Sequence, residues 1–133
     1  MIQAAIAVLV RDNKVLLARR APHRKDYPNR WDFIGGRIET GETPQAALAR
    51  ELGEELAISL KNAVFLKKML DRHLRPDDPP TYWFFKVTEW VGTPVIANDE
   101  HSALNWFTLA QMQVLPDLAD RAYLDLATEA LSS

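Results

Sequence analysis

The chain has 133 residues, of which 47% are hydrophobic and 26% are charged, and its formal net charge is -2 at pH 7. These values predict a single globular domain spanning residues 1–133, and they exclude a protein that binds duplex nucleic acid through its phosphates. Because there is no cysteine, disulfides, zinc–thiolate sites and cysteine nucleophiles are excluded too. The apolar segment 2–10 is too short to span a bilayer and has no basic leader, so we expect no membrane partner and a cytoplasmic protein.

Residues 2–10 and 15–19 are mostly aliphatic and predict two strands, joined by a hairpin connection at residues 11–14. Because the first run is apolar almost throughout, we expect a strand buried on both faces, in a sheet that helices cover. Arg19 and Arg20 end the second strand, and adjacent side chains of a strand point to opposite faces. Adjacent arginines are commonly a solvated strand end, and a contact with a phosphorylated ligand is the alternative.

A turn with three glycines follows the aromatic segment 31–34, which we expect to pack in the core. These glycines are Gly35, Gly36 and Gly41. Glycine permits positive φ and lets the backbone approach a ligand closely, so this turn is a candidate binding loop. Thr43 and Pro44 then predict the start of a helix, as its N-cap and its first-turn proline.

Three glutamates of this helix, Glu51, Glu54 and Glu55, are spaced i, i+3 and i+4, which places them on one helix face. Like charges at i and i+4 destabilise a helix by about 0.2–0.5 kcal/mol, so a cation on this face would offset that cost. Ligands that are all oxygen suit Mg²⁺ or Mn²⁺ better than zinc. Acid-rich helix faces are commonly only solvated. The glycine turn and the additional Glu42 beside it favour a metal site here.

Residues 36–58, GRIETGETPQAALARELGEELAI, resemble the signature of the Nudix hydrolases, and more narrowly of MutT-like members. That signature is G-x5-E-x7-R-E-U-x-E-E-x-G-U, with U aliphatic. The matching positions are Gly36, Glu42, Arg50, Glu51, Leu52, Glu54, Glu55 and Ile58. The departure is Ala57, where the family has glycine. A glycine would end the helix in a left-handed cap, so either the helix ends differently or Ala57 is strained. Gly53 either admits another segment or is a tolerated imperfection costing about 1 kcal/mol.

The resemblance implies a site that binds Mg²⁺ or Mn²⁺ and hydrolyses a phosphoric anhydride. The implied metal ligands are Glu51, Glu54 and Glu55, with a backbone carbonyl of Gly35 or Gly36. The implied catalytic residues are Glu51, Glu54, Arg50 and Glu100. Arg50 would orient the neighbouring carboxylates, since it can reach Glu54 at i and i+4. The base is Glu51, Glu54 or Glu100, since members of the family differ.

The resemblance also implies the residues that contact the nucleotide. They are Arg20, Gly35, Gly36 and Asp120. For Asp120 the alternative is an acid in the first turn of the last helix, where it complements the helix dipole. His101 beside Glu100 is expected at the surface or behind the metal ligands.

The remaining segments complete an α/β fold. Residues 62–71 and 81–90 predict two strands, residues 108–112 a short turn or helix, and residues 116–131 a closing amphipathic helix. Glu100 lies in a polar loop six residues before Trp106, a spacing that MutT-like enzymes share. The pattern and the resemblance together predict an α/β/α sandwich with a mixed β-sheet between helices.

The implied function is Mg²⁺-dependent hydrolysis of a nucleoside diphosphate linked to another group. We expect a MutT-like nucleoside triphosphate pyrophosphohydrolase that releases a nucleoside monophosphate and pyrophosphate, with oxidised nucleotides such as 8-oxo-dGTP among its substrates. The alternative is an ADP-ribose or nucleotide-sugar pyrophosphatase. A different class is a non-catalytic nucleotide sensor on the same fold, although such modules usually lose the acids that this chain retains. The expected partner is a small nucleotide, and the expected assembly is a monomer or a homodimer.

Overall fold

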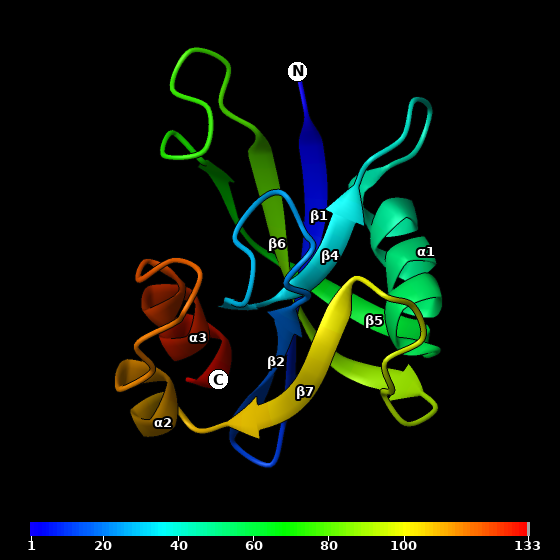
Figure 1. The fold of residues 1–133 in the computed structure, drawn as a ribbon. Helices are drawn as coiled ribbons and strands as arrows, with labels where there is room; N and C mark the ends of the chain where they lie inside the picture. The colour runs from blue at the N-terminus through cyan, green and yellow to red at the C-terminus, as the bar shows by residue number, and fades with distance from the viewer. Residues whose placement is uncertain (133) are drawn as a thin grey trace.

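The computed structural model describes residues 1–132, which form a sheet with helices on both sides (Figure 1). In chain order the elements are β1 (Gln3–Arg11), β2 (Lys14–Arg20), β3 (Trp31–Asp32), β4 (Ile34–Arg37), α1 (Pro44–Leu56), β5 (Ser59–Leu70), β6 (Thr81–Val91), β7 (His101–Phe107), α2 (Leu109–Gln113) and α3 (Tyr123–Leu131). The predicted strands and the acidic helix are therefore confirmed, with shifts at some ends. Within the described residues no helix is both long and apolar enough to cross a membrane.

β1 is the strand around which the sheet is built. It pairs antiparallel with β2 at residues 10–11, antiparallel with β4 at residues 4–7, and in parallel with β6 at residues 3–9. β5 pairs antiparallel with β6, and β7 pairs antiparallel with β2, so the seven-stranded sheet is mixed as predicted. The predicted hairpin between β1 and β2 turns through Asp12 and Asn13, whose φ values of 53° and 60° suit a two-residue hairpin loop.

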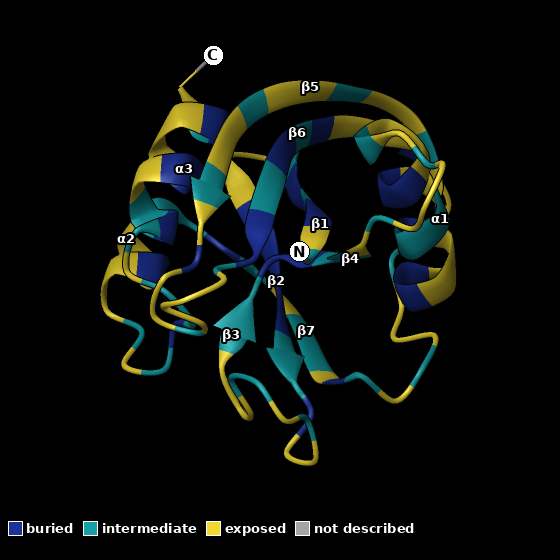
Figure 2. Ribbon diagram, turned by 90° about the horizontal axis from the view of Figure 1, so that it is seen from above, coloured by how far each residue is buried: buried dark blue, intermediate teal, exposed yellow. Residues whose placement is uncertain are grey.

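Helices cover both faces of this sheet, with α1 on one side and α2 and α3 on the other (Figures 1 and 2). Leu9 of β1 packs in the core beneath α1, together with Leu52, while Val8 packs in the core beneath α3, together with Leu126. All four side chains are almost fully buried. The apolar run in β1 is thus buried on both faces, and the predicted α/β/α sandwich is confirmed.

α1 begins as its sequence predicts and ends in a strained conformation. The hydroxyl of Thr43 accepts a hydrogen bond from the Ala46 N–H at 3.1 Å, and Pro44 is the first helical residue. At the other end Ala57 is left-handed, with φ 57° and ψ 36°, so this alanine occupies the cap that a glycine would fill without strain. A Cβ on Gly53 would meet only the Ile58 carbonyl at 3.9 Å, so no other segment needs that glycine.

The closing helix is shorter than the sequence predicts. We expected it from residue 116, but α3 begins at Tyr123. The backbone before it pairs with Trp31 of β3 instead. The Trp31 N–H donates to the Asp117 carbonyl at 2.9 Å, and the Ala119 N–H donates to the Trp31 carbonyl at 2.8 Å. These tertiary hydrogen bonds place Leu118 in a parallel β-bridge with Trp31, which the apolar periodicity of the segment could not reveal. The short helix α2 is capped by Thr108 and Gln111, in agreement with the sequence.

Replacing Ala57 by glycine should stabilise the protein, because the left-handed region costs an alanine about 1 kcal/mol or more. We expect the free energy of unfolding, measured by urea titration, to rise by up to about 1 kcal/mol. The matched control is Ala49→Gly, because Ala49 is exposed inside α1, where a glycine should lower the same free energy by about 1 kcal/mol. A loss of stability in both variants would contradict the strain at Ala57.

Candidate functional site

The glycine turn allows β4 to lie close to both β1 and α1. A Cβ on Gly35 would overlap the Ala5 carbonyl of β1, and a Cβ on Gly36 would overlap the carboxylate of Glu51. Only Gly41 among these three glycines has a positive φ, at 86°. The tolerance of glycine for positive φ is therefore used at Gly41, whereas at Gly35 and Gly36 its lack of a side chain is what matters. Those two are required because a side chain would not fit, and Gly36 in particular makes room for Glu51.

The three glutamates of α1 lie in very different surroundings. Glu55 is buried with 2% of its surface exposed, and its Oε2 atom has no hydrogen-bond partner among the described residues. Burial is the largest cause that raises the pKa of Glu55, and the neighbouring carboxylates of Glu100 and Glu51 raise it further. Burial also raises the pKa of Glu51. Glu54 is more exposed, with 56% of its side chain in solvent. The acidic face thus runs from a buried carboxylate to a solvated one.

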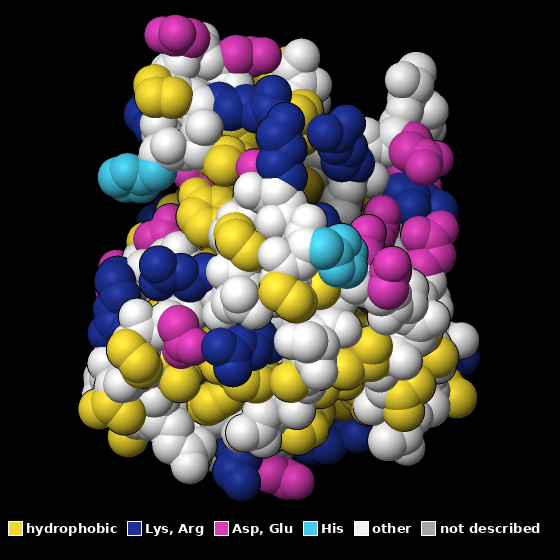
Figure 3. Space-filling model, in the orientation of Figure 1, with side chains coloured by type: hydrophobic (Ala, Val, Ile, Leu, Met, Phe, Trp, Pro, Cys, Tyr) yellow, Lys and Arg dark blue, Asp and Glu magenta, His cyan; other side chains and the backbone are white. Residues whose placement is uncertain are grey.

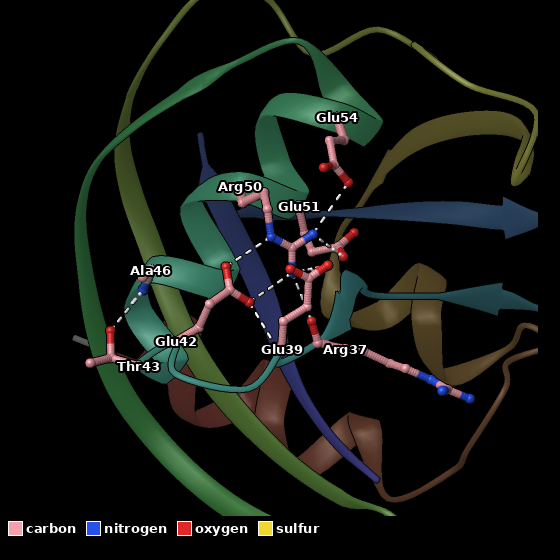
Figure 4. A network of polar contacts seen from close by, with 8 residues as sticks. All are labelled: Arg37, Glu39, Glu42, Thr43, Ala46, Arg50, Glu51 and Glu54. Carbon is pink, nitrogen blue, oxygen red and sulfur yellow. Dashed lines mark hydrogen bonds and ion pairs between the residues drawn. The ribbon is translucent and has the colours of Figure 1, made fainter.

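Arg50 holds the acids of this region in place (Figure 4). Its Nε and Nη2 atoms donate to the two carboxylate oxygens of Glu42, each at 2.9 Å. Its Nη1 atom donates to Glu51 at 2.9 Å and lies 3.4 Å from Glu54, and Nη2 also donates to the Arg37 carbonyl at 2.9 Å. Arg50 was expected to orient the acids, and the structure brings it against Glu51 and Glu54. One guanidinium therefore joins β4, the following loop and α1.

Glu42 is an anchor for Arg50 rather than an open ligand, and its part was not foreseen. Besides its two hydrogen bonds from Arg50, it accepts one from the Glu39 N–H at 2.8 Å. The hydrogen bonds from Arg50, then from the backbone of Glu39, lower its pKa to about 2. The spacing of eight residues between Glu42 and Arg50 crosses the start of a helix, so periodicity alone could not show this contact.

Glu100 and His101 close the buried end of the acidic face. The carboxylate of Glu100 lies close enough to Glu55 to raise its pKa, and it also forms an ion pair with Arg24 at 3.5 Å. The Nδ1 atom of His101 lies 3.7 Å from Glu55 Oε1. Burial lowers the pKa of His101 to about 4, so the imidazole is neutral at pH 7 and does not neutralise Glu55. His101 lies behind the acids, which is one of the two expected places.

The acids are suited to a divalent cation by their chemistry and burial. In the part of the chain that the structure describes, no three acidic or histidine side chains converge as a ready-made metal cage, since Arg50 bonds Glu51 and lies against Glu54. The unpartnered Oε2 atom of buried Glu55 and the space that Gly36 leaves beside Glu51 nevertheless match a hard, oxygen-binding ion. Acidic side chains also gather over this side of the surface, beside lysines and arginines (Figure 3).

A pocket of about 130 Å³ adjoins the acids. Its lining consists of Ala4, Ile6, Arg20, Arg24, Tyr27, Asp32, Gly35, Gly36, Arg37, Tyr82 and Tyr123. Gly36 touches Glu51 and Arg24 pairs with Glu100, so the pocket is continuous with the acidic site. The predicted binding residues Arg20, Gly35 and Gly36 all line it. Sequence reasoning gave no role to Arg24 or Arg37, whose only signal was their charge in polar segments.

Asp32 is a pocket residue that the sequence pattern did not single out. It lies between Trp31 and Phe33, and its ion pair with Arg20 spans 3.7 Å. Burial raises the pKa of Asp32 to about 6, although the charge of Arg20 opposes this shift. Asp120 does not line the pocket, but its charge also raises the pKa of Asp32. Its Oδ1 atom accepts the Ala122 N–H at 2.9 Å, so Asp120 stabilises the turn before α3.

A larger cavity of about 260 Å³ lies at the β1–β2 hairpin. It is lined by Arg11, Asp12, Lys14, Thr93, Pro94 and Trp106. None of the predicted site residues lines it, and it lacks the buried acids. We therefore take the smaller pocket, which adjoins the acids of α1, as the candidate functional site.

Glu42→Gln should make the free energy of unfolding depend less on pH between pH 2 and pH 4.5. Because Arg50 lowers the pKa of Glu42 in the folded state, its charge stabilises the fold above its ordinary pKa of 4.5, and this stabilisation is lost as the pH falls toward 2. We expect the variant to be less stable than the parent at pH 7, with the difference closing between pH 4.5 and pH 2 in urea titrations. Exposed Glu129→Gln is the control and should show no difference. A difference constant with pH would contradict the interaction.

Glu55→Gln should stabilise the protein in the presence of a chelator. Because the pKa of Glu55 is raised in the folded state, folding must keep a proton on this group above pH 4.5, at a cost of up to about 1.4 kcal/mol per pH unit. The free energy of unfolding of the variant should exceed that of the parent increasingly from pH 5 to pH 7. Added Mg²⁺ should raise the melting temperature of the parent and not of the variant. Equal Mg²⁺ responses would contradict a metal ligand at Glu55.

Comparisons with known proteins agree with the fold and identify a family. The family model of the NUDIX domain matches residues 1–126. The 8-oxo-dGTP diphosphatase of Escherichia coli K12 is 33% identical over 93 residues, which cover 70% of each chain. The CTP pyrophosphohydrolase of the same organism is 47% identical over 58 residues, 44% of this chain and 42% of that one. The crystal structure of MutT NUDIX hydrolase from Burkholderia pseudomallei superposes with a TM-score of 0.82 at 28% identity, covering 97% of this chain and 96% of that chain. The chain belongs to the Nudix hydrolase family.

Proposed function

We propose that this protein is a nucleoside triphosphate pyrophosphohydrolase that uses Mg²⁺ or Mn²⁺. The observation that supports this most directly is the buried carboxylate of Glu55, whose Oε2 atom has no hydrogen-bond partner among the described residues, beside a pocket lined by three arginines. Buried like charges favour a bound cation, and arginines suit phosphate oxygens because they offer paired N–H donors. The likeness to an 8-oxo-dGTP diphosphatase and to a CTP pyrophosphohydrolase supports a nucleotide substrate.

Glu51, Glu54 and Glu55, with the backbone carbonyl of Gly36, are the proposed metal ligands. A bound divalent cation neutralises phosphate charge and lowers the pKa of a water molecule. Arg50 would keep Glu51 and Glu54 oriented through the bonds it already makes. Because Arg50 is itself anchored by Glu42, the carboxylates lose little conformational freedom when they bind an ion.

Arg20, Arg24 and Arg37 are the proposed contacts of the phosphates, since all three line the pocket that adjoins the acids. In the proposed reaction the oxygen of water attacks a phosphorus of the anhydride between the α- and β-phosphates. The bond from that phosphorus to the bridging oxygen breaks, and nucleoside monophosphate and pyrophosphate leave. A carboxylate takes the proton of the water. The candidate bases are Glu51, Glu54 and Glu100, and the ion pair with Arg24 connects Glu100 to the pocket lining.

The test is hydrolysis of a panel of nucleotides in Mg²⁺, with products resolved by chromatography. The panel contains dGTP, 8-oxo-dGTP, CTP, ADP-ribose, a nucleotide sugar and a dinucleoside polyphosphate. A nucleoside monophosphate and pyrophosphate from a triphosphate is the expected result. AMP and ribose 5-phosphate from ADP-ribose alone would replace the proposal with an ADP-ribose pyrophosphatase. Binding without turnover of any compound would indicate a nucleotide sensor.

Glu54→Gln should lower kcat by at least two orders of magnitude, because it removes a proposed metal ligand from an exposed position without disturbing the core. The melting temperature should change little. The control is Glu129→Gln, which alters an exposed acid on α3 and should keep the kcat of the parent. Full activity of Glu54→Gln would contradict the proposed metal ligands.

A further inference from the structure

Asp71 is a buried acid that the proposed reaction does not use. It follows the last residue of β5 and is 7% exposed. Its Oδ2 atom accepts hydrogen bonds from the Tyr27 hydroxyl at 2.7 Å and the Tyr82 hydroxyl at 2.9 Å, and its Oδ1 atom accepts the Leu74 N–H at 3.1 Å. Within residues 1–132 no cation forms an ion pair with Asp71. Its charge is therefore balanced by three directed hydrogen bonds, each of which fixes a different segment.

Two of these three donors belong to the pocket wall. Tyr27 and Tyr82 both line the pocket. Burial and the charge of Asp71 raise the pKa of both hydroxyls, so each keeps its proton and donates to Asp71. Tyr82 is fixed by the pairing of β6 with β1 and β5, but Tyr27 lies outside the strands and helices. Asp71 therefore matters most for the position of Tyr27.

Tyr27 lies in the pocket loop, which we define as residues 21–30, between β2 and β3. Its φ of 51° is unusual for a bulky side chain, and such a conformation persists only where other contacts impose it. The base of the loop is closed by the hydrogen bond from the Asn29 N–H to the Arg20 carbonyl, at 3.0 Å. Two side chains of the loop contact other parts of the protein. Arg24 pairs with Glu100 at the acidic site, and Tyr27 bonds Asp71 at the opposite side.

The pocket is small enough for the position of this loop to decide what enters. At about 130 Å³ it is below the roughly 300–1,000 Å³ of sites that enclose a drug-sized ligand. Tyr27 and Arg24 are the lining residues that come from the pocket loop, whereas nearly all the others lie on strands. A change in the loop therefore changes the shape of the pocket without changing the sheet.

We propose that Asp71 is a positioning residue for nucleotide binding: it holds Tyr27, and with it the pocket loop, in the wall of the nucleotide pocket. This inference rests on the proposed function, because it names a residue that sets the affinity of the same pocket. Asp71 contacts none of the glutamates of α1, so its removal weakens binding and leaves the chemical step in place.

The test compares Asp71→Asn with Asp77→Asn. Asp77 is exposed in the β5–β6 loop and makes no hydrogen bond or ion pair within the described residues, so it controls for the same loss of charge nearby. With dGTP and CTP as substrates, Asp71→Asn should raise KM about tenfold, the effect of losing one hydrogen bond to a charged group, while kcat stays within about twofold. Calorimetry with dGMP and CMP should show the same weakening of Kd. Asp77→Asn should match the parent.

Tyr27→Phe is a second, more conservative variant, since it removes one hydroxyl and keeps the ring. It should raise KM as Asp71→Asn does. The double variant should raise KM no further, because both changes break the same contact, the hydrogen bond between the Tyr27 hydroxyl and Asp71. Hydrogen exchange supplies a readout independent of activity: the amides of Asn29 and Arg30 should exchange faster in both variants than in the parent. These amides donate to the carbonyls of Arg20 and Tyr27.

The outcomes separate this inference from the proposed function. If the parent binds these nucleotides and both variants bind them with the same affinity, the inference is wrong and the proposed function stands. A fall in kcat without a change in KM would also overturn the positioning role. If the parent neither binds nor hydrolyses the nucleotides, both the proposed function and the role of Asp71 in it are wrong.

Discussion

The bidentate contact between Arg50 and Glu42 is the interaction on which the geometry of the site depends. Both Glu42 oxygens accept from the guanidinium at 2.9 Å, which fixes the plane of the arginine. The remaining N–H groups then reach Glu51, Glu54 and the Arg37 carbonyl, so the end of β4 and the acidic face of α1 keep one relative position. Lysine could not replace this arginine, because a single ammonium cannot donate in these several directions from one plane.

The same arrangement explains how the fold tolerates four acids in so small a space. Arg50 neutralises the more accessible carboxylates, but it does not reach Glu55, which is buried with one oxygen unpartnered. His101 beside it is held neutral by burial, so the protein itself supplies no countercharge at that point. Such a site stores unfavourable electrostatic energy that a divalent cation would relieve. In this respect the acids would favour the binding of a cation at the expense of the stability of the free protein.

Sequence patterns predicted the elements well where local chemistry decides the structure. The sequence predicted three features that depend on neighbours along the chain. They are the apolar run of β1, the turn at Asp12 and Asn13, and the start of α1 at Thr43 and Pro44. The sequence did not predict the start of α3, because Asp117 and Ala119 form hydrogen bonds with the backbone of Trp31, which lies far earlier in the chain. The glycine turn was placed correctly, but the sequence could not show that Gly36 is needed for the room it leaves Glu51.

By itself the sequence determined the family resemblance, the sandwich fold and the acidic face of α1, since these follow from residue spacing within a helix or a strand. Only the tertiary structure decided which acids remain open to a ligand. It turns Glu42 toward Arg50, buries Glu55, and brings Glu100 from a distant loop to the same place. It also assembles the pocket from β1, β2, β3, β4, β6, α3 and the pocket loop, and attaches that loop to Asp71. These contacts join residues far apart in the chain, and burial and charge, which depend on the whole fold, decide their chemistry.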